Sequence, residues 1–387
     1  MPREPLITPP AAQPRIVRGR FLGRVLRNDL LCPEHYYLTL VVRDFPASVP
    51  GQFIQLSCTP NDDFGREGGI SSRHDATAQR ASAGGVDFSA DTPRELEWRV
   101  GGGVELRNDP DLARARAFLR RPFSLAGRRE LLPPPPHAAA VVAAKGGGET
   151  ELDIIYRVYG KGTRHLETLR AGDEVSLLGP LGHGFVIPKD LGLGLLVGGG
   201  VGIPPMFYLA EALHAAGKKG LAFIGAQRRT LLPVALDTGI APTHTGTPNA
   251  CTTDFARYGF ASVITTDDGS VGMKGFVPEA LDRYLAEALE HLPQEKIVVY
   301  CCGPTPMMRA TAAVAAKHAV VCQVSLEQPM ACGMGTCQSC VIRWRPKPEA
   351  AALQVVHGTT AEGTGWVYKL TCTDGPVFDV REIVWEK

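Results

Sequence analysis

The sequence has no apolar run long enough to cross a bilayer, and its opening, MPREPLITPPAAQPR, lacks the apolar core of a signal peptide. We therefore expect no contact with a membrane and a cytoplasmic location. An excess of charge of one sign is also lacking, because 41 Lys and Arg against 40 Asp and Glu leave a formal net charge of +1. Without an electrostatic field to gather polyanions, we expect no nucleic-acid partner.

Cysteine is sparse over most of the chain, with ten in 387 residues. Without a secretory signal, that number argues against a disulfide framework and favours reduced thiols, metal ligands or redox chemistry. Three of the ten fall within MACGMGTCQSC, residues 330–340. Five others are most simply interpreted as small, buried apolar side chains: Cys32, Cys58, Cys251, Cys301 and Cys322.

The chain is long enough for two or three domains, and its first half has the pattern of an all-β domain. After a flexible tail at 1–14, residues 15–186 contain short β-type runs such as YYLTLVV, GQFIQLSC and LDIIYRVYG, separated by Gly and Pro. This pattern predicts an antiparallel β-barrel. Two segments at about 60–118 and 128–150 are rich in Gly, Ser, Ala, Asp or Pro, and we expect them to be surface insertions.

The pattern changes to that of a parallel α/β domain near residue 187. LGLGLLVGGGVGIPPMFYLAEALHAAG indicates a buried strand, a glycine turn and a helix, and further strands are expected in GLAFIGA, ASVITTDDG and KIVVYCCGP. We predict a parallel α/β nucleotide-binding domain over 187–321. The remaining 322–387 are too short for an independent core, so we expect a small domain that leans on the rest through a metal site.

The cysteine-rich stretch has the spacing of an iron–sulfur site. Cys332, Cys337 and Cys340 are spaced C-x4-C-x2-C, and Cys372 supplies a fourth thiol after 31 intervening residues. This is the plant-type [2Fe–2S] pattern, in which small residues between the ligands let the backbone N–H groups approach sulfur. The alternative is a structural zinc site, but zinc ribbons use paired C-x2-C knuckles, and only Cys337 and Cys340 form one.

Two glycine-containing turns are candidates for nucleotide binding. Gly198, Gly199, Gly200 and Gly202 stand between a strand and a helix, where backbone N–H groups and the helix N-terminus would meet a pyrophosphate. The alternative is a tight turn with proline at the helix start. A later strand ends in Cys302, Gly303 and Pro304, and doubly wound sheets bind their ligands at such strand ends.

The barrel contains two stretches of unusual content for strands, RRPFSL and YRVYGKGTRHLETL. Arg121 would pair with a phosphate and Ser124 would bond the edge of a flavin, while Gly162 and Thr163 open a short helix that would hold a second phosphate. Taken singly, each of these features has a structural explanation as a solvated charge or a common helix start. Their order along the chain is what indicates a flavin site.

That order, R-P-F-S, Y-R-V, G-x-G-T, V-G-G-G-x-G-x-P-P, C-G-P-x-P-M, C-x4-C-x2-C and the closing CTDGPVFDVREI, resembles the electron-transfer subunits of class 1B dihydroorotate dehydrogenases, within the ferredoxin–NAD(P) reductase superfamily. The resemblance implies a flavin-binding barrel, a nucleotide-binding domain and a C-terminal [2Fe–2S] domain, with NAD(H), FAD and the cluster as cofactors. It implies that FAD is bound by Arg121, Pro122, Phe123, Ser124, Ile155, Tyr156, Arg157, Gly162 and Thr163.

The resemblance also implies that Gly198 to Gly202, Gly303 and Pro304 meet the nicotinamide nucleotide, with Cys302 beside the nicotinamide as a catalytic residue. The cluster ligands would be Cys332, Cys337, Cys340 and Cys372. The implied partner is an FMN-containing dihydroorotate dehydrogenase catalytic subunit, joined in a heterotetramer of two chains of each kind, in pyrimidine biosynthesis.

Three features depart from the resemblance. The two insertions are long, and the stretch between Cys340 and Cys372 is longer than expected, so the DGPVFD context is what identifies the fourth ligand. The strand GLAFIGA lacks a following acidic residue that would hold a ribose hydroxyl, whereas Arg228 and Arg229 lie where a 2′-phosphate would be read. NADH is the family expectation, and NADPH stays open.

Two rival functions remain at this point. The same three modules would serve the reductase subunit of another multi-component complex, of the hydrogenase or transhydrogenase type. A non-enzyme alternative is a nucleotide-sensing scaffold whose cysteine-rich segment holds structural zinc.

Overall fold

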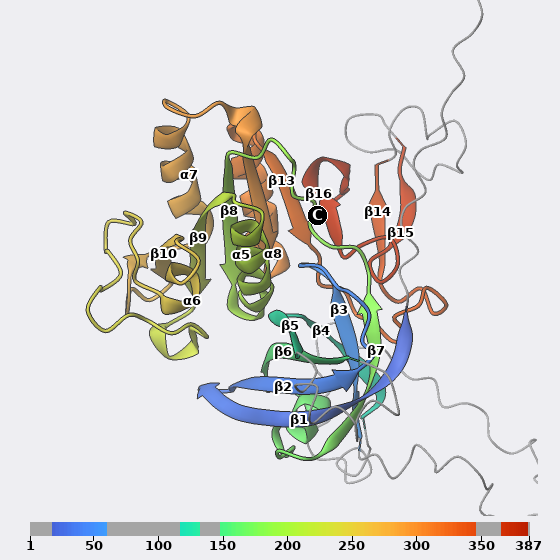
Figure 1. Ribbon diagram of the computed structural model, residues 1–387. Helices are drawn as coiled ribbons and strands as arrows, with labels where there is room; N and C mark the ends of the chain where they lie inside the picture. Colours follow the sequence, from blue (N-terminus) through green and yellow to red (C-terminus); the bar gives the residue numbers. More distant parts are fainter. Residues whose placement is uncertain (1–17, 60–116, 132–147, 346–364, 386–387) are drawn as a thin grey trace, which may run out of the picture.

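The computed structural model describes residues 18–59, 117–131, 148–345 and 365–385. Figure 1 shows a β domain and an α/β domain, with a small β segment beside them. The expected tail at 1–14 lies outside the described residues, as do most of the two expected insertions and most of the long stretch between Cys340 and Cys372. The ends of the second expected insertion are described, and they are strand residues rather than loop.

The β domain is one antiparallel sheet in the order β4-β3-β7-β1-β2-β6-β5. Its edge strands β4 and β5 are joined by only Leu125 and Ala126, so the sheet must curl until its two edges approach, which gives a half-barrel. One short helix, α4 (Lys161–Glu167), lies between β6 and β7. The strands are β1 (Gly19–Cys32), β2 (His35–Arg43), β3 (Phe53–Cys58), β4 (Ala117–Ser124), β5 (Gly127–Leu131), β6 (Glu149–Arg157) and β7 (Glu174–Leu181).

The α/β domain is a second seven-stranded sheet, in the order β11-β10-β9-β8-β12-β13-β16. The pairs from β11 to β13 are parallel, and only β16 runs antiparallel to its neighbour. Its strands are β8 (Leu193–Gly199), β9 (Lys219–Ala226), β10 (Ala261–Thr266), β11 (Met273–Lys274), β12 (Ile297–Cys302), β13 (Val321–Ser325) and β16 (Val377–Asp379), and its α-helices are α5 (Pro204–Ala215), α6 (Thr253–Ala256), α7 (Val277–Ala288) and α8 (Thr305–Lys317). Short 3-10 turns connect them at Gly200–Gly202, Arg229–Leu231 and Gln294–Lys296.

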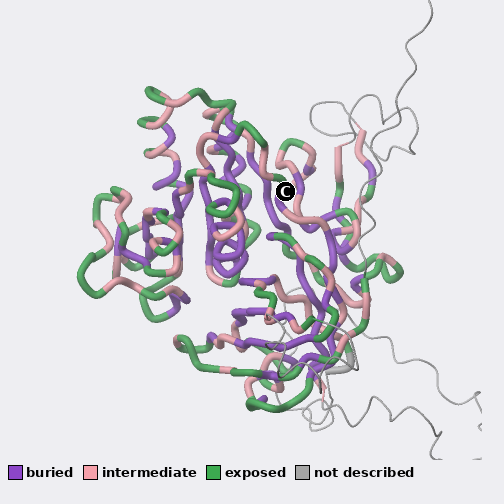
Figure 2. The backbone as a smooth tube through the Cα atoms, in the orientation of Figure 1, coloured by how far each residue is buried: buried purple, intermediate pink, exposed green. Residues whose placement is uncertain are grey.

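The strands of the α/β sheet are buried on both faces, as a covered parallel sheet requires. Along β8, Leu195 and Val197 pack with α7 and α8, whereas Leu196 packs with α5 and α6 on the opposite face. Because alternate side chains point to opposite faces and both faces are covered, the side chains of the strand are apolar on both faces. Figure 2 shows the buried backbone concentrated in these central strands and in the barrel.

The C-terminal segment does not stand apart from the α/β sheet. Its ladder of β14 (Val341–Trp344) and β15 (Val367–Leu370) is followed by β16, which pairs with β13 through Ser325 and Val377. A last 3-10 turn spans Val380–Glu382. The domain boundary that we expected at 321/322 therefore lies inside β13, which cannot leave the sheet because β12 and β16 both depend on it for hydrogen bonds.

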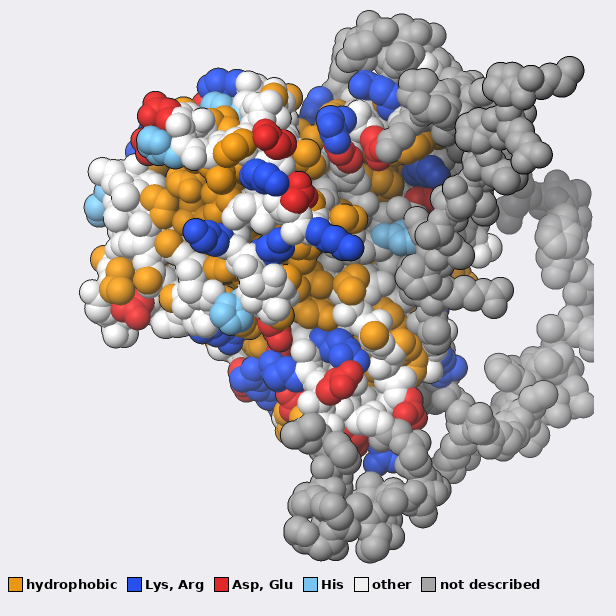
Figure 3. Space-filling model, turned by 45° about the horizontal axis from the view of Figure 1, so that its top comes forward, with side chains coloured by type: hydrophobic (Ala, Val, Ile, Leu, Met, Phe, Trp, Pro, Cys, Tyr) orange, Lys and Arg blue, Asp and Glu red, His pale blue; other side chains and the backbone are white. Residues whose placement is uncertain are grey.

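The surface agrees with the balanced composition. In the face shown in Figure 3, basic and acidic side chains are interspersed over both domains rather than gathered into one field. Within the described ranges, no helix is both long and apolar enough to cross a membrane.

Candidate functional site

A cavity of about 850 Å³ lies between the half-barrel and the carboxyl ends of the parallel strands. This is where an open α/β sheet binds ligands, and the volume is that of a pocket for a drug-sized or cofactor-sized molecule. Twelve of the residues that the sequence predicted for flavin and nucleotide line it: Pro122, Phe123, Ser124, Ile155, Tyr156, Arg157, Gly199, Gly200, Gly202, Cys302, Gly303 and Pro304.

The barrel wall of the cavity is held rigid by aromatic packing and one ion pair. The ring of Tyr156 stacks on Tyr36 at 5.7 Å between centroids and meets Phe123 edge to face at 5.9 Å. Arg157 is fixed by Glu34, with 2.6 Å between Nη2 and Oε2. Because the Tyr156 hydroxyl already donates to Asn28, this wall offers a ligand mainly ring surfaces, the Arg157 cation and backbone groups.

Arg121, Gly162 and Thr163 lie together beside the cavity rather than in its wall. A Cβ at Gly162 would come within 3.2 Å of Cys58 and 3.4 Å of Arg121, so α4 approaches the barrel closely at this glycine. The Thr163 hydroxyl accepts from the backbone N–H groups of Tyr159 and Gly160 and shapes the turn before α4. Its side chain is therefore occupied, and a phosphate there would meet Arg121 and backbone N–H groups.

The glycine turn after β8 packs directly on the end of β12. A Cβ at Gly202 would fall 2.2 Å from the Cys302 carbonyl oxygen, and one at Gly199 would fall 2.5 Å from the Met307 sulfur. Gly198 faces Ile203 instead and does not line the cavity. The turn thus brings backbone N–H groups to the cavity. Helix α5 begins with two prolines, as the sequence pattern of proline at a helix start predicts.

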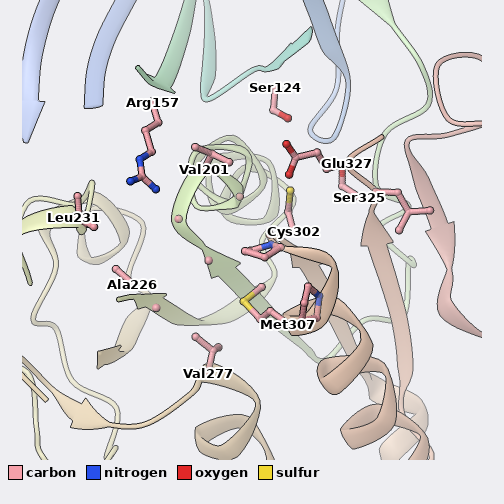
Figure 4. A pocket seen from close by; sticks show the side chains of 18 of the residues that line it. Ser124, Arg157, Val201, Ala226, Leu231, Val277, Cys302, Met307, Ser325 and Glu327 are labelled. Carbon is pink, nitrogen blue, oxygen red and sulfur yellow. The ribbon is translucent and has the colours of Figure 1, made fainter. Parts of the chain in front are cut away.

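Cys302 faces the cavity beside two groups that the sequence analysis did not single out. Figure 4 shows its sulfur and the Glu327 carboxylate pointing into the same space below Ser124. Burial raises the pKa of Cys302 to about 12; a hydrogen bond with Ser325 opposes this shift, and the Glu327 charge adds to it. The thiol is therefore neutral at every pH at which the protein would be assayed.

Glu327 and Ser325 are functional candidates that the sequence analysis missed. Ser325 ends β13, the strand next to β12, and Glu327 follows it by two residues, so the rule that led to Cys302 would have found both. Glu327 is exposed and Ser325 is buried. Phe53 and Met330 also line the cavity. The sequence placed Met330 only at the start of the cysteine-rich stretch and gave no sign of Phe53.

The sequence suggested that Arg228 and Arg229 bind a 2′-phosphate, and the structure shows where they lie relative to the cavity. Arg228 and Arg229 are exposed and do not line the cavity, whereas the neighbouring Gln227 does. An acidic residue, Asp267, reaches the cavity from the end of β10, and burial raises the pKa of its carboxyl group. Acidic side chains thus line the cavity at Asp267 and at Glu279, although none follows β9.

The four cysteines of the C-terminal segment interact as two pairs. The Cys337 N–H donates to Cys332 Sγ at 3.4 Å, and Cys372 is buried against Cys340. Burial, followed by the Cys340 thiol, raises the pKa of Cys372 to about 12, whereas hydrogen bonds from Ser339 and then Cys332 lower the pKa of Cys337 to about 6. In the part of the chain that the structure describes, no three His, Cys, Asp or Glu side chains gather around one point that could hold a metal ion.

The paired arrangement fits a binuclear cluster. A [2Fe–2S] cluster takes four thiolates, two at each iron, so two pairs of cysteines meet its demand. Backbone N–H groups also point at sulfur, since Met334 N donates to Cys332 Sγ at 3.4 Å. All ten cysteines are free thiols, and the four apolar candidates Cys58, Cys251, Cys301 and Cys322 are buried, while Cys32 is half-buried.

The buried half of the cluster site rests on the barrel. Cys340 and Cys372 pack with Phe53 and Leu181, and partly buried residues surround them; we call this set the barrel–cluster core: Phe53, Leu181, Cys340, Cys372, Leu178, Met330 and Leu370. Phe53 and Met330 belong both to this core and to the cavity wall. The cavity and the cluster site are therefore separated by shared side chains.

Comparison with known proteins agrees with this geometry. Residues 327–384 match the model of the iron–sulfur cluster binding domain of dihydroorotate dehydrogenase B, and residues 196–313 match the oxidoreductase NAD-binding domain. The electron transfer subunit of dihydroorotate dehydrogenase B (NAD(+)) from Caldanaerobacter subterraneus subsp. tengcongensis is 33% identical over 61% of this chain and 77% of that protein. The corresponding subunit from Bacillus cereus strain 03BB102 is 33% identical over 61% of this chain and 75% of that one.

The chain belongs to the family of dihydroorotate dehydrogenase B electron transfer subunits. It is thus an oxidoreductase subunit with an iron–sulfur domain and an NAD-binding domain. Membership of this family sets aside the zinc scaffold and the reductases of other complexes as alternatives.

The fold has a wider distribution than the family. The solved structure of an NADH-dependent reduced ferredoxin–NADP oxidoreductase superposes with a TM-score of 0.55 over 94% of this chain and 90% of that one, at 21% sequence identity. This likeness concerns the fold alone, which is an antiparallel β domain followed by a parallel α/β domain.

We predict that Cys302→Ala slows NADH-driven flavin reduction about ten-fold, which is about 1.4 kcal/mol of barrier, and changes NADH affinity less. The reason is that a neutral thiol facing the cavity orients the reactants rather than holding the nucleotide. Because its pKa is about 12, the wild-type rate should show no titration of this thiol between about pH 6 and 10. Stopped-flow absorbance measures both quantities.

The matched control is Cys301→Ala, because Cys301 is the adjacent residue of β12 and packs in the core on the other face. It should lower the melting temperature and leave flavin reduction unchanged. Equal rates of flavin reduction in Cys302→Ala and wild type would show that Cys302 only fills space in the structure.

Proposed function

We propose that this chain carries electrons between NAD(H) and the FMN of a separate dihydroorotate dehydrogenase catalytic subunit, with its own FAD and [2Fe–2S] cluster as intermediate carriers. The observation that supports this most directly is the shared wall between the two sites. Phe53 and Met330 line the cavity and pack in the barrel–cluster core, so two redox groups would be held next to one another by a single layer of side chains.

The residues of the cavity fit a flavin and a nicotinamide together. The flavin would lie against the barrel wall, with Ser124 at its edge and its phosphates toward Arg121 and the start of α4. The nicotinamide nucleotide would enter over the glycine turn, where Gly202 brings the backbone to the end of β12. A bound flavin supplies the chemistry that joins a two-electron hydride donor to a one-electron cluster.

The chain's own residues orient these groups and exclude water. Cys302 and Glu327 point into the space at which the two rings would meet. Met330, which lines the cavity and packs in the barrel–cluster core, would separate that space from the cluster. At the cluster, the lowered pKa of Cys337 favours the thiolate form that ligates iron.

The partner is proposed from what surrounds the cysteine loop. Cys337 is exposed, and so are the apolar side chains of Met334 at 56% and Val341 at 37%. Apolar residues around a redox centre suit a protein interface, because a partner that covers them excludes water from the transfer path. We propose a heterotetramer of two chains of each kind, in the cytoplasm, where thiols stay reduced.

We predict that Cys337→Ser loses or destabilises the cluster but keeps FAD and NADH-driven flavin reduction. Cys337 belongs to the exposed end of the thiol pairs, away from the cavity wall, so its loss should not disturb the flavin. Iron analysis, flavin analysis and stopped-flow reduction of anaerobically purified protein measure the three properties. Cys32→Ser, in β1 of the barrel, is the control and should keep about two irons and one FAD per chain. Simultaneous loss of FAD and iron in Cys337→Ser would show that the two sites are not separable.

We predict that co-expression with an FMN-containing dihydroorotate dehydrogenase subunit yields a complex that oxidises dihydroorotate with NAD⁺, which neither subunit does alone. Met334→Lys should weaken the complex, because it places a charge in the proposed apolar interface. Leu30→Lys replaces an equally exposed leucine, 62% accessible, on the barrel strand β1 and should leave it intact. Co-purification and NAD⁺-linked turnover are the measurements. Failure to associate would contradict the partner, although the cofactor assignment would stand.

A further inference from the structure

Gln55 is a polar side chain buried in the middle of the barrel strand β3. It is 0% exposed, and neither its Oε1 nor its Nε2 atom has a hydrogen-bond partner among the described residues. Leaving both halves of a buried carboxamide unpaired is costly, so this group calls for a partner, and the described residues do not supply one. The question is which ligand that carboxamide meets.

Gln55 lies on the face of β3 that points away from the barrel core. Ile54 and Leu56 point into the barrel core, whereas Phe53 belongs to the barrel–cluster core. Because side chains alternate along a strand, Gln55 shares the face of Phe53. Its partner in β7 is Leu178, which also packs in the barrel–cluster core. Gln55 therefore faces the cysteine loop.

The contact with that loop is close and specific. A Cβ at Gly333 would lie 2.6 Å from Oε1 and 2.9 Å from Nε2 of Gln55, so the carboxamide lies against the backbone of the residue that follows Cys332. Gly333 has φ +71°, a conformation that suits glycine, and it is buried. The absence of a side chain at this position is what lets the carboxamide reach the loop.

Gln52, another buried glutamine, has hydrogen-bond partners for both ends of its carboxamide within the chain. Its Nε2 donates to Gly182 O at 2.8 Å and its Oε1 accepts from Val49 N at 2.9 Å. Gln55, three residues later, has neither kind of contact among the described residues. Its neighbour across β4 is Pro122, which has no N–H to offer.

We propose that the Gln55 carboxamide donates a hydrogen bond to a sulfur atom of the cluster beside Gly333, on the Cys332 side. Two backbone N–H groups, of Met334 and Cys337, already donate to Cys332 Sγ from within the loop, and Gln55 adds a donor from the barrel. The inference rests on the proposed cluster and goes further, since it gives a flavin-domain residue control over the potential of the cluster.

The direction of this control follows from charge. Reduction adds negative charge to the cluster, and N–H donors to its sulfur atoms stabilise the reduced form, which raises the potential. Gln55 is also paired with Pro122 of the flavin motif, so it links the flavin strand to the cluster loop without contacting solvent.

The test is the midpoint potential of the cluster in Gln55→Met, measured by EPR-monitored titration of the whole chain. Methionine has nearly the same length but no N–H, so we expect a lower midpoint potential and a changed EPR spectrum, with iron and FAD content retained. Ser57→Ala is the matched control: it removes a buried polar group from the same face of β3, one that bonds Thr59 instead, and it should leave the potential unchanged. An unchanged potential and spectrum in Gln55→Met would overturn the proposal.

If Gln55→Met fails to hold the cluster, the unsubstituted residue provides a second measurement. Pulsed EPR of reduced protein labelled with ¹⁵N in glutamine side chains should show a weak coupling to the cluster. Gln328 and Gln338, which are not buried, are replaced by Met to remove glutamines close to the loop in sequence. A cluster without this coupling would refute the role of Gln55 alone, whereas a wild-type chain without any cluster would refute the proposed function as well.

Discussion

The contact of the C-terminal segment with both other domains at once is the constraint on which the rest of the structure depends. At one end, β16 pairs with β13 and ties the segment into the parallel sheet. At the other, Cys340 and Cys372 pack on Phe53 of the barrel. The C-terminal segment is too short to form a hydrophobic core of its own, so it is stabilised by packing on the other two domains. This packing holds its cysteines in place.

This placement also builds the cavity. After β13 the chain passes through Glu327 and Met330 into the cysteine loop. Residues that line the cavity and residues of the cluster site are therefore neighbours in sequence. The residues that follow β13 therefore belong both to the cavity wall and to the approach to the cysteine loop, so we expect a backbone change there to affect both sites. The ends of the parallel strands form one side of the cavity, and the curled antiparallel sheet forms the other, with the Tyr156 and Phe123 rings and the Arg157 cation.

The sequence predicted the parts of this arrangement that depend on local spacing. The glycine turn before α5 and an antiparallel β domain followed by a parallel α/β domain follow from such patterns, and the structure has both; the expected barrel is a half-barrel. Contacts between distant segments were not predictable: Gly162 of α4 lies against Cys58 and Arg121 of the barrel, and Glu327 lines the cavity together with Cys302. Gln55 could have been noticed as the lone amide in the strand FIQLSC, but only the register of β3 shows which way it faces.

The central claim is that electrons pass from nicotinamide to cluster inside this single chain. Anaerobic addition of NADH to the purified chain, without any partner, tests it directly when absorbance and EPR are followed together. The account predicts that the flavin absorbance falls first and that the EPR signal of a reduced [2Fe–2S] cluster then appears in the same sample. An intact cluster that dithionite reduces but that stays silent after NADH has reduced the flavin would contradict the account.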